Sequence, residues 1–321
     1  MSPWEVIKMS EENKAILKAE GLTKIFSSGI INKEYTVAVN NASFELYPGK
    51  VTSLVGESGS GKTTVGRLIL KLIEPTAGKI FFKGQDITDI EDRDTKKEYY
   101  RQIQGVFQDP FSSFNPLFKI NRIFDILFRE FEPETKNREE LISQSLEEVN
   151  LNPDRILDKY PHQLSGGQLQ RLLIARALLL DVDILVADEI ISMLDASTKM
   201  GVLNLLVDIC RDKGMAVLFI THDLNLGYYL SDDTLILHEG NLVERGATTK
   251  VYENPYHPYT QMLFDSVPDI EEKWDRSKEF IPEQIIEAVE EFYQNNDEEG
   301  YKEVEENHFV LMSILETENY K

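Results

Sequence analysis

Short runs of hydrophobic residues alternate along the chain with segments in which hydrophobic residues recur every three or four positions. Residues 51–55, 184–187 and 217–220 are apolar runs of a length typical of buried strands, and each is followed by polar residues and a helical pattern. Residues 38–46 predict a further strand, joined to the first run by a Pro-Gly turn at residues 47–50. This order predicts an α/β domain with a mostly parallel sheet, whose ligands bind at the carboxyl ends of the strands.

The segment at residues 109–165 has a helical pattern rich in aromatic residues, and we expect an inserted helical subdomain there. Seven of the 16 phenylalanines lie close together at spacings of three and four, which are typical of one helix face. They are Phe107, Phe111, Phe114, Phe118, Phe124, Phe128 and Phe131. Packing inside the subdomain is the first interpretation of this set, and a groove that receives a helix from a partner is the second.

Composition and charge narrow the class of protein. The 321 residues are 41% hydrophobic, which indicates one large globular domain with an appendage or two domains. The single cysteine, Cys210, cannot form an internal disulfide, and no Cys/His cluster is spaced to hold zinc or an iron–sulfur cluster. No stretch reaches the 18 or so apolar residues that a membrane span needs. A net charge of −22 argues against nucleic acid or anionic lipid as the main ligand.

Residues 56–63, Gly-Glu-Ser-Gly-Ser-Gly-Lys-Thr, match the phosphate-binding pattern G-x-x-x-x-G-K-[ST] between a predicted strand and a predicted helix. The glycines let backbone N–H groups surround the phosphates, Lys62 brings a positive charge to them, and the Thr63 hydroxyl ligates Mg²⁺. A merely glycine-rich turn is the alternative, and the lysine, the threonine and both flanks argue against it. The sequence therefore predicts that this P-loop binds a nucleoside triphosphate.

Residues 165–168, Ser-Gly-Gly-Gln, begin another helical segment. Such a turn presents N–H donors and the positive end of the helix dipole, which suit an anionic phosphate, although an ordinary helix cap has the same sequence. The motif stands about 20 residues before the end of an apolar strand that finishes in Asp188-Glu189. That order favours the phosphate-binding interpretation.

Together these motifs resemble those of ATP-binding cassette (ABC) ATPases over residues 14–268. The resemblance implies an α/β fold: a P-loop NTPase core of the RecA-like kind with an antiparallel β subdomain and an inserted helical subdomain. It leaves an N-terminal tail at residues 1–13 and an α+β extension at residues 269–321, which has 17 acidic and 5 basic residues. It also implies that Asp188 holds Mg²⁺ and that Glu189 polarises the attacking water as general base.

Four further positions match the family. Gln108 corresponds to the Q-loop glutamine near Mg²⁺ and water, and His222 to the switch histidine that contacts the γ-phosphate. Asp195 lies in the D-loop, which reaches across a dimer, and Phe26 stands where a ring stacks on adenine, with core packing as its alternative. The expected catalytic residues are Glu189, His222 and Gln108, and the expected Mg²⁺ ligands are Thr63, Gln108 and Asp188. The expected contacts to ATP are Phe26, Gly56, Ser58, Gly59, Ser60, Gly61, Lys62, Thr63, Thr64, Ser165, Gly166, Gly167, Gln168 and Asp195.

Residues 106–116 (VFQDPFSSFNP), 159–167 (KYPHQLSGG) and 254–268 (NPYHPYTQMLFDSVP) resemble the oligopeptide/dipeptide importer subfamily, whose members also carry oligosaccharides or nickel. Residues 174–178 (IARAL) resemble the second, F-type ATPase of systems that pair two different ATPases. Ile190 departs from the family because a proline usually follows the general base, and this puts the local loop geometry in doubt. Many relatives have a cysteine-rich tail segment for an iron–sulfur cluster, which this chain lacks.

The acidic extension predicts an amphipathic helix at residues 282–293, with Pro at its start and apolar residues on one face. That helix should bury its apolar face against the body or a partner ATPase. Residues 302–310 resemble the subfamily's C-terminal strand, which usually has Gly where Asn307 stands, and His308 has no second ligand spaced to form a metal site. Because the nucleotide motifs end at His222, we expect no part for the extension in nucleotide binding.

The resemblance implies an ATP-hydrolysing importer subunit that pairs with a second ABC ATPase on two membrane permease subunits at the cytoplasmic face of the membrane. An extracytoplasmic substrate-binding protein would act indirectly, and no nucleic acid is expected. One alternative is a soluble ABC clamp of DNA repair or translation, opposed by the single cassette, the absence of long heptads or basic stretches, and the charge. The other is a catalytically weak binding subunit, opposed by intact Lys62, Glu189 and His222.

Overall fold

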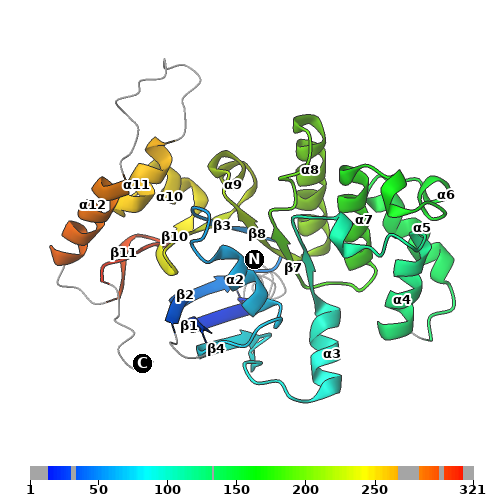
Figure 1. Cartoon of the computed structure of the whole chain (residues 1–321), viewed down its shortest axis with the longest axis horizontal. Coiled ribbons are helices and arrows are strands. Elements are labelled where there is room, and N and C mark those ends of the chain that lie inside the picture. Colours follow the sequence, from blue (N-terminus) through cyan, green and yellow to red (C-terminus); the bar gives the residue numbers. More distant parts are fainter. Residues whose placement is uncertain (1–13, 30–33, 132–133, 267–281, 296–299, 314–321) are drawn as a thin grey trace, which may run out of the picture. The chain divides into compact units, whose positions relative to one another are not determined.

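The computed structural model describes residues 14–29, 34–131, 134–266, 282–295 and 300–313 (Figure 1). They form two compact units, which we name by their contents. The P-loop unit comprises the described residues within 17–46, 52–88 and 220–313, and the helical unit comprises those within 14–16, 47–51 and 89–219. Among the described residues, no helix combines the length and apolar character that a membrane crossing requires.

The P-loop unit is built on a mixed sheet in the order β5-β4-β1-β2-β10-β9-β3. Most neighbours are antiparallel, whereas β3 runs parallel to β9, and β10 meets β2 in parallel through Asn241 and Asn40. Helix α2 follows β3 through the P-loop. The bounds are β1 (Leu17–Ser28), β2 (Glu34–Leu46), β3 (Val51–Val55), α2 (Lys62–Ile69), β4 (Ala77–Phe82), β5 (Gln85–Asp86), β9 (Asp233–His238) and β10 (Asn241–Ala247).

The C-terminal part of this unit adds helices and a hairpin to the same sheet. Its elements are α9 (Leu224–Leu230), α10 (Thr248–Glu253), α11 (Pro258–Asp265), α12 (Pro282–Gln294), β11 (Tyr301–Glu305) and β12 (His308–Leu311). Strand β12 pairs antiparallel with both β10 and β11. The expected single strand at residues 302–310 is therefore a hairpin, and Asn307 takes a left-handed φ of 56° at its turn. That backbone conformation explains why a glycine suits this position.

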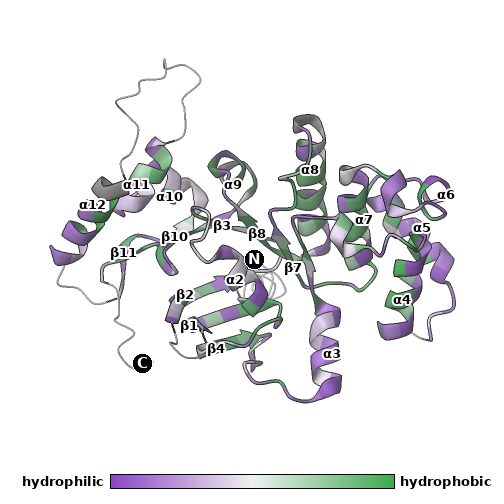
Figure 2. Cartoon of the chain, in the orientation of Figure 1, coloured by the Kyte–Doolittle hydropathy of each residue, from purple (hydrophilic) through white to green (hydrophobic). Residues whose placement is uncertain are grey.

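The helical unit contains a short parallel sheet in the order β8-β7-β6 and most of the helices. Its elements are α3 (Arg93–Gln102), β6 (Ile103–Val106), α4 (Asn121–Phe131), α5 (Arg138–Glu148), α6 (Pro153–Ile156), α7 (Gly166–Leu178), β7 (Ile184–Asp188), α8 (Ala196–Lys213) and β8 (Ala216–Thr221), with 3-10 turns at Phe111–Ser113 and Pro161–Gln163. Strands β7 and β8 are buried throughout and are mostly green in Figure 2. These are the apolar runs from which buried strands were expected.

The aromatic segment of the helical unit is only partly helical. Phe124 and Phe128 lie on α4 and are buried, which confirms packing for that half. The helix face expected from Phe107 to Phe118 is wrong, because a 3-10 turn and other turns occupy this stretch. Asp109 Oδ1 accepts from the N–H of Phe111 (2.9 Å), and Asn115 Oδ1 from that of Leu117 (3.0 Å), so side chains compete with helical hydrogen bonds there.

Candidate nucleotide-binding and hydrolysis site

The P-loop leaves the carboxyl end of β3 and enters α2 at Lys62. Gly61 has a φ of 106°, and a Cβ added there would lie 2.2 Å from the carbonyl oxygen of Ala38. A Cβ on Gly56 would lie 2.1 Å from the carbonyl oxygen of Leu237. Both positions therefore require glycine, for backbone approach as well as for conformation.

Lys62 is buried, and its ammonium group donates to the carbonyl oxygens of Gly56 (2.8 Å) and Glu57 (2.6 Å). These two bonds hold the ammonium group of Lys62 within the curve of the P-loop. Thr63, next on the helix, is exposed, and Thr64 is half-buried. The first turn of α2 thus offers a cation, a hydroxyl and backbone N–H groups at one helix N-terminus, an arrangement suited to phosphate.

Neighbouring segments hold the rest of the loop in place. Ser58 and Gly59 are exposed at its tip, while Ser60 is buried and its carbonyl oxygen accepts from the N–H of Gly240 (2.9 Å). The N–H of Glu57 donates to the hydroxyl oxygen of Tyr259 (3.1 Å). Sequence reasoning missed Tyr259, although it lies in the quoted segment at residues 254–268.

His222 and Phe26 also belong to the P-loop unit, and both are exposed. His222 follows β8 directly; Thr221 Oγ1 accepts from the N–H of Asp223 (3.0 Å), and Asp223 caps α9, so the turn around the histidine is fixed on one side. The Phe26 ring is 42% exposed, with Lys24 Nζ 5.2 Å from its centroid. The core-packing alternative for Phe26 therefore does not hold.

In the helical unit, Ser165 caps α7, which begins at Gly166. The Ser165 hydroxyl accepts from the N–H of Gln168 (3.2 Å), and Gln168 Oε1 accepts from the N–H of Ser165 (3.0 Å). This capping box satisfies two donors and leaves the glycine N–H groups at the positive end of the helix. A Cβ on Gly167 would lie 2.3 Å from Thr198 Cγ2, so α8 packs too closely for any other residue.

Strand β7 ends at the buried Asp188, and the chain then turns sharply at Glu189. Glu189 has a left-handed φ of 49°, and its carbonyl oxygen accepts from both the N–H (3.1 Å) and the hydroxyl (3.0 Å) of Ser192. A non-glycine residue in this conformation costs about 1–3 kcal/mol and is common at functional sites. Ile190, in place of the family's proline, is buried beside this turn.

Gln108 follows β6 and is exposed, and Asp195 caps α8 by accepting from the N–H of Thr198 (3.0 Å). The buried Gln170, which sequence reasoning missed, donates to the carbonyl oxygens of Phe107 (3.3 Å) and Ile190 (2.5 Å). One amide of α7 thus ties the base of the Gln108 loop to the turn after Glu189. The position of Gln170, two residues beyond the Ser-Gly-Gly-Gln motif, was the signal in the sequence that could have identified it.

The described residues contain no group of three or more His, Cys, Asp or Glu side chains that could hold a metal by themselves. Mg²⁺ is usually held by one or two protein oxygens together with water and phosphate. The Thr63 hydroxyl, the Gln108 amide oxygen and the Asp188 carboxylate are donors of this chemistry. The residue types therefore fit Mg²⁺ delivered with ATP.

Comparisons with known proteins identify the family of this chain. Residues 39–192 match the family model "ABC transporter", and residues 243–293 match "Oligopeptide/dipeptide transporter, C-terminal region". The dipeptide transport ATP-binding protein DppF of Haemophilus influenzae is 40% identical over 262 residues, which are 80% of each chain. The oligopeptide transport ATP-binding protein OppF of Streptococcus mutans is 36% identical over 98% of this chain and 99% of its own.

A solved structure shares the fold: the dimeric ATP-binding cassette MJ0796 in a post-hydrolysis state with ADP and phosphate. Its TM-score is 0.64 at 28% identity, over 72% of this chain and 98% of that one. The fold and the motifs thus define an ABC ATPase, which binds ATP and hydrolyses it. Within that class, the chain belongs to the family of oligopeptide/dipeptide transporter ATP-binding proteins.

Proposed function

We propose that this chain energises an importer of oligopeptides, dipeptides or related solutes such as oligosaccharides or nickel. It pairs with a second ABC ATPase on two permease subunits at the cytoplasmic face of the membrane, and a substrate-binding protein delivers the solute outside. The observation that carries the proposal is the match to a peptide-transport relative over 98% of the chain, which includes the subfamily's C-terminal region.

The P-loop takes the phosphates of MgATP. Lys62 brings its ammonium to the β- and γ-phosphates, and backbone N–H groups at the N-terminus of α2 donate to them. Thr63, Asp188 and Gln108 supply oxygen ligands to Mg²⁺ directly or through water. The exposed Phe26 ring stacks on the adenine, and Lys24 beside it supplements the stack by a cation–π contact.

Hydrolysis depends on Glu189 and His222. The Glu189 carboxylate polarises the attacking water, and positioned general-base chemistry of this kind contributes about 10²- to 10⁴-fold. His222 donates to the γ-phosphate, where charge develops. The N-terminus of α7, with Ser165 to Gln168, completes the site of the partner ATPase rather than its own, and Asp195 contacts that partner. Each ATP therefore lies between two subunits.

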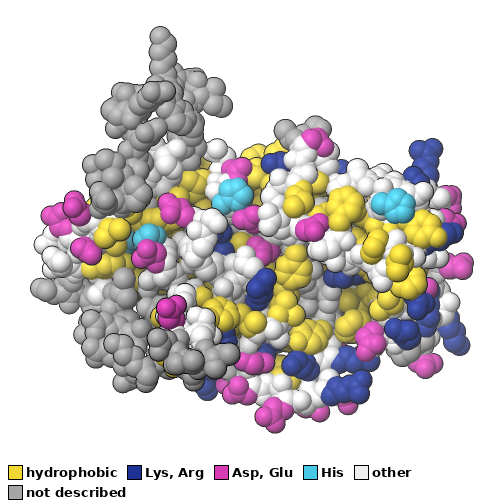
Figure 3. Space-filling model, in the orientation of Figure 1, with side chains coloured by type: hydrophobic (Ala, Val, Ile, Leu, Met, Phe, Trp, Pro, Cys, Tyr) yellow, Lys and Arg dark blue, Asp and Glu magenta, His cyan; other side chains and the backbone are white. Residues whose placement is uncertain are grey.

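The helical unit carries the surface that supports docking on a permease. Its large exposed hydrophobic side chains between β6 and the end of α4 are Phe111, Leu117, Phe118 and Ile126, of which Leu117 is 79% exposed. Figure 3 shows hydrophobic side chains exposed over this helical insert, with Lys and Arg around them. An exposed apolar cluster of this kind is typical of an interaction surface. Of the seven phenylalanines of the aromatic segment, Phe111 and Phe118 are the ones to which the partner-binding interpretation still applies.

The deciding experiment purifies the tagged full chain from gently solubilised membranes of its own cells and identifies the stoichiometric partners by mass spectrometry. Two permease subunits and a second ABC ATPase are expected. A DNA-repair or ribosomal partner without any permease would refute the importer and support the soluble clamp.

A surface variant tests the docking site. Leu117→Asp should break association with the permease at an unchanged melting temperature, because the side chain is exposed. Leu72→Asp makes the same change at a 55% exposed leucine of the P-loop unit and should leave association intact. Equal association of both variants would refute the docking surface.

A further inference from the structure

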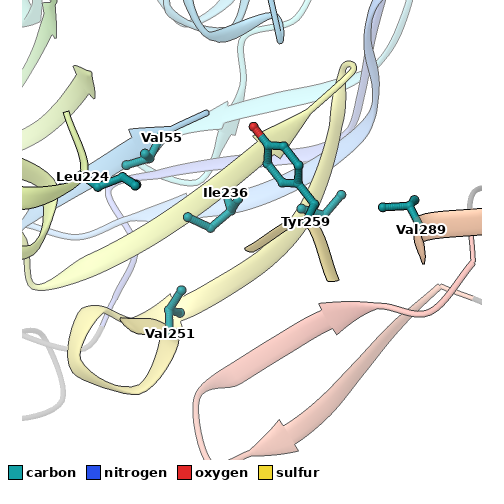
Figure 4. Close-up of a cluster of buried hydrophobic side chains, with 7 residues drawn as sticks. Val55, Leu224, Ile236, Val251, Tyr259 and Val289 are labelled. Atoms are coloured by element: carbon teal, nitrogen blue, oxygen red, sulfur yellow. The ribbon is translucent and has the colours of Figure 1, made fainter. Parts of the chain in front are cut away.

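The segment at residues 254–260 places an aromatic side chain against the P-loop. His257 caps α11 and Pro258 begins it, which fixes the direction of the next side chain. Tyr259 is 1% exposed, its ring stacks on His238 with 3.9 Å between centroids, and its hydroxyl oxygen accepts from the N–H of Glu57. In Figure 4 this hydroxyl points away from Val289, beyond the apolar cluster that surrounds the ring.

The peptide unit between Gly56 and Glu57 is held at both of its polar ends. Its carbonyl oxygen, which belongs to Gly56, accepts from Lys62 Nζ at 2.8 Å, and its N–H, which belongs to Glu57, donates to Tyr259 at 3.1 Å. A rotation of this peptide would break both bonds at once. The orientation that gives Lys62 its acceptor is therefore the one that Tyr259 stabilises.

We propose that Tyr259 is a positioning residue for the phosphate-binding loop: its hydroxyl orients the Gly56–Glu57 peptide, and this peptide aims Lys62 at the phosphates of the nucleotide. The inference rests on the role proposed above for Lys62. It gives the C-terminal region a role in nucleotide binding, although Tyr259 lies outside all of the nucleotide-binding motifs.

The acidic extension is linked to Tyr259 by hydrogen bonds through His257. The N–H of Tyr259 donates to His257 Nδ1 (3.2 Å), so the neutral ring carries its proton on Nε2, which donates to the hydroxyl of Tyr293 on α12 (3.1 Å). Burial, and secondarily the nearby His238, lowers the pKa of His257 to about 3, so this histidine stays neutral near pH 7. A chain of hydrogen bonds thus joins α12 to the P-loop.

Packing follows the same route as the hydrogen bonds. Val289 of α12 lies in one buried cluster with Tyr259, Val55 and Ile236, and Ile285 and Tyr293 pack against it. The expected burial of the helix face is confirmed for Val289, whereas Ile286 is 52% exposed. The cluster joins α12 to the end of β3, immediately before the P-loop, so the ring and hydroxyl of Tyr259 have one fixed position.

The test compares Tyr259→Phe with Tyr252→Phe in the full-length chain. Tyr252 packs against the same cluster, and its hydroxyl donates to the carbonyl oxygen of Leu224 (2.9 Å), so each variant loses one hydroxyl bonded to backbone. Affinities for MgADP and AMP are measured by titration well below the melting temperatures. We expect Tyr259→Phe to weaken MgADP binding about threefold to tenfold, the effect of one hydrogen bond, and to leave AMP binding unchanged because AMP has no β-phosphate.

Tyr252→Phe should lower the melting temperature alone. Equal MgADP affinities of the two variants would overturn the proposal, as would an equal loss for AMP. Hydrogen exchange of the wild-type chain gives a second reading that needs no variant: the Glu57 amide should be protected although its residue is exposed, and rapid exchange there would also overturn the proposal. Lys62→Ala separates the two hypotheses, because normal MgADP binding by that variant refutes the P-loop role itself.

Discussion

Replacing Gln170 by methionine should destabilise the chain and slow ATP hydrolysis. Methionine keeps the length and flexibility of glutamine but has no donor for the carbonyl oxygens of Phe107 and Ile190. Both bonds lie within the helical unit, one at the base of the Gln108 loop and one at the turn after Glu189. The variant therefore releases two catalytic segments from one buried side chain.

The magnitude depends on which groups lose their partner. Ile190 is 1% exposed, so its unsatisfied carbonyl costs about 1–3 kcal/mol, whereas Phe107 is half-buried and water can replace the lost donor. Gln170 Oε1 is buried without a hydrogen-bond partner among the described residues, and its removal returns about 1 kcal/mol. The difference between these two terms is about 0–2 kcal/mol, and at its middle, about 1 kcal/mol, the melting temperature falls by about 2–4 °C.

Gln261→Met is the matched control. Gln261 also donates to two backbone carbonyl oxygens, those of Pro255 (2.9 Å) and Tyr256 (3.4 Å), but it is exposed. That variant should stay within about 0.5 kcal/mol of wild type. The assays are thermal unfolding of the full chain and ATP turnover in the assembled complex. Equal melting temperatures of the two variants, or turnover of Gln170→Met at the wild-type level, would refute the reasoning.

Three further expectations follow from the site. Glu189→Gln should bind MgATP normally and hydrolyse it at least ~100-fold more slowly in the assembled complex; turnover above a third of wild type would exclude Glu189 as the base. The isolated chain should be a poor ATPase that the partner ATPase activates, and full activity of a dilute monomer would contradict a site shared between subunits. The pKa of His257 in the folded chain lies below its unfolded value near 6.5, so the stability of the fold should be constant above that pH. On acidification towards pH 3 the stability should fall, and the loss should reach about 2 kcal/mol at pH 5. His257→Asn should flatten this pH profile of stability, and a profile as steep as that of wild type would assign the loss to other groups.

The strands were predictable where an apolar run meets a strong turn signal. Strand β3 has the bounds expected from sequence, because Pro-Gly precedes it and the glycine-rich loop follows it. The spacing from Phe107 to Phe118 was misleading, because Asp109 and Asn115 bond to nearby backbone and Phe111 and Phe118 remain exposed. Hydrogen bonds from polar side chains to nearby backbone set the conformation of this stretch, and the spacing of hydrophobic residues does not predict such bonds.

The predicted site residues are those whose chemistry shows in a short motif. Lys62 and Ser165 take positions suited to phosphate at helix N-termini, and their detailed roles stay predictions. Tyr259 and Gln170 were not predictable in the same way, because each acts on the backbone of a residue distant in sequence, 202 positions for Tyr259 and Glu57. Such bonds depend on the fold: a position beside a motif singles out Gln170 or Tyr259 but does not identify the backbone group that each one contacts.

The strand that leads into the P-loop pairs with one made much later in synthesis. Ser53 of β3 lies beside Thr234 of β9, 181 residues further along the chain, and their hydroxyls are 2.9 Å apart. At about 5–20 residues per second, a ribosome needs roughly 10–40 s to cover that interval. For most of it, the nascent chain contains a complete P-loop motif whose supporting strand does not yet exist. ATP capture should therefore begin abruptly and late in translation, after β9 has emerged.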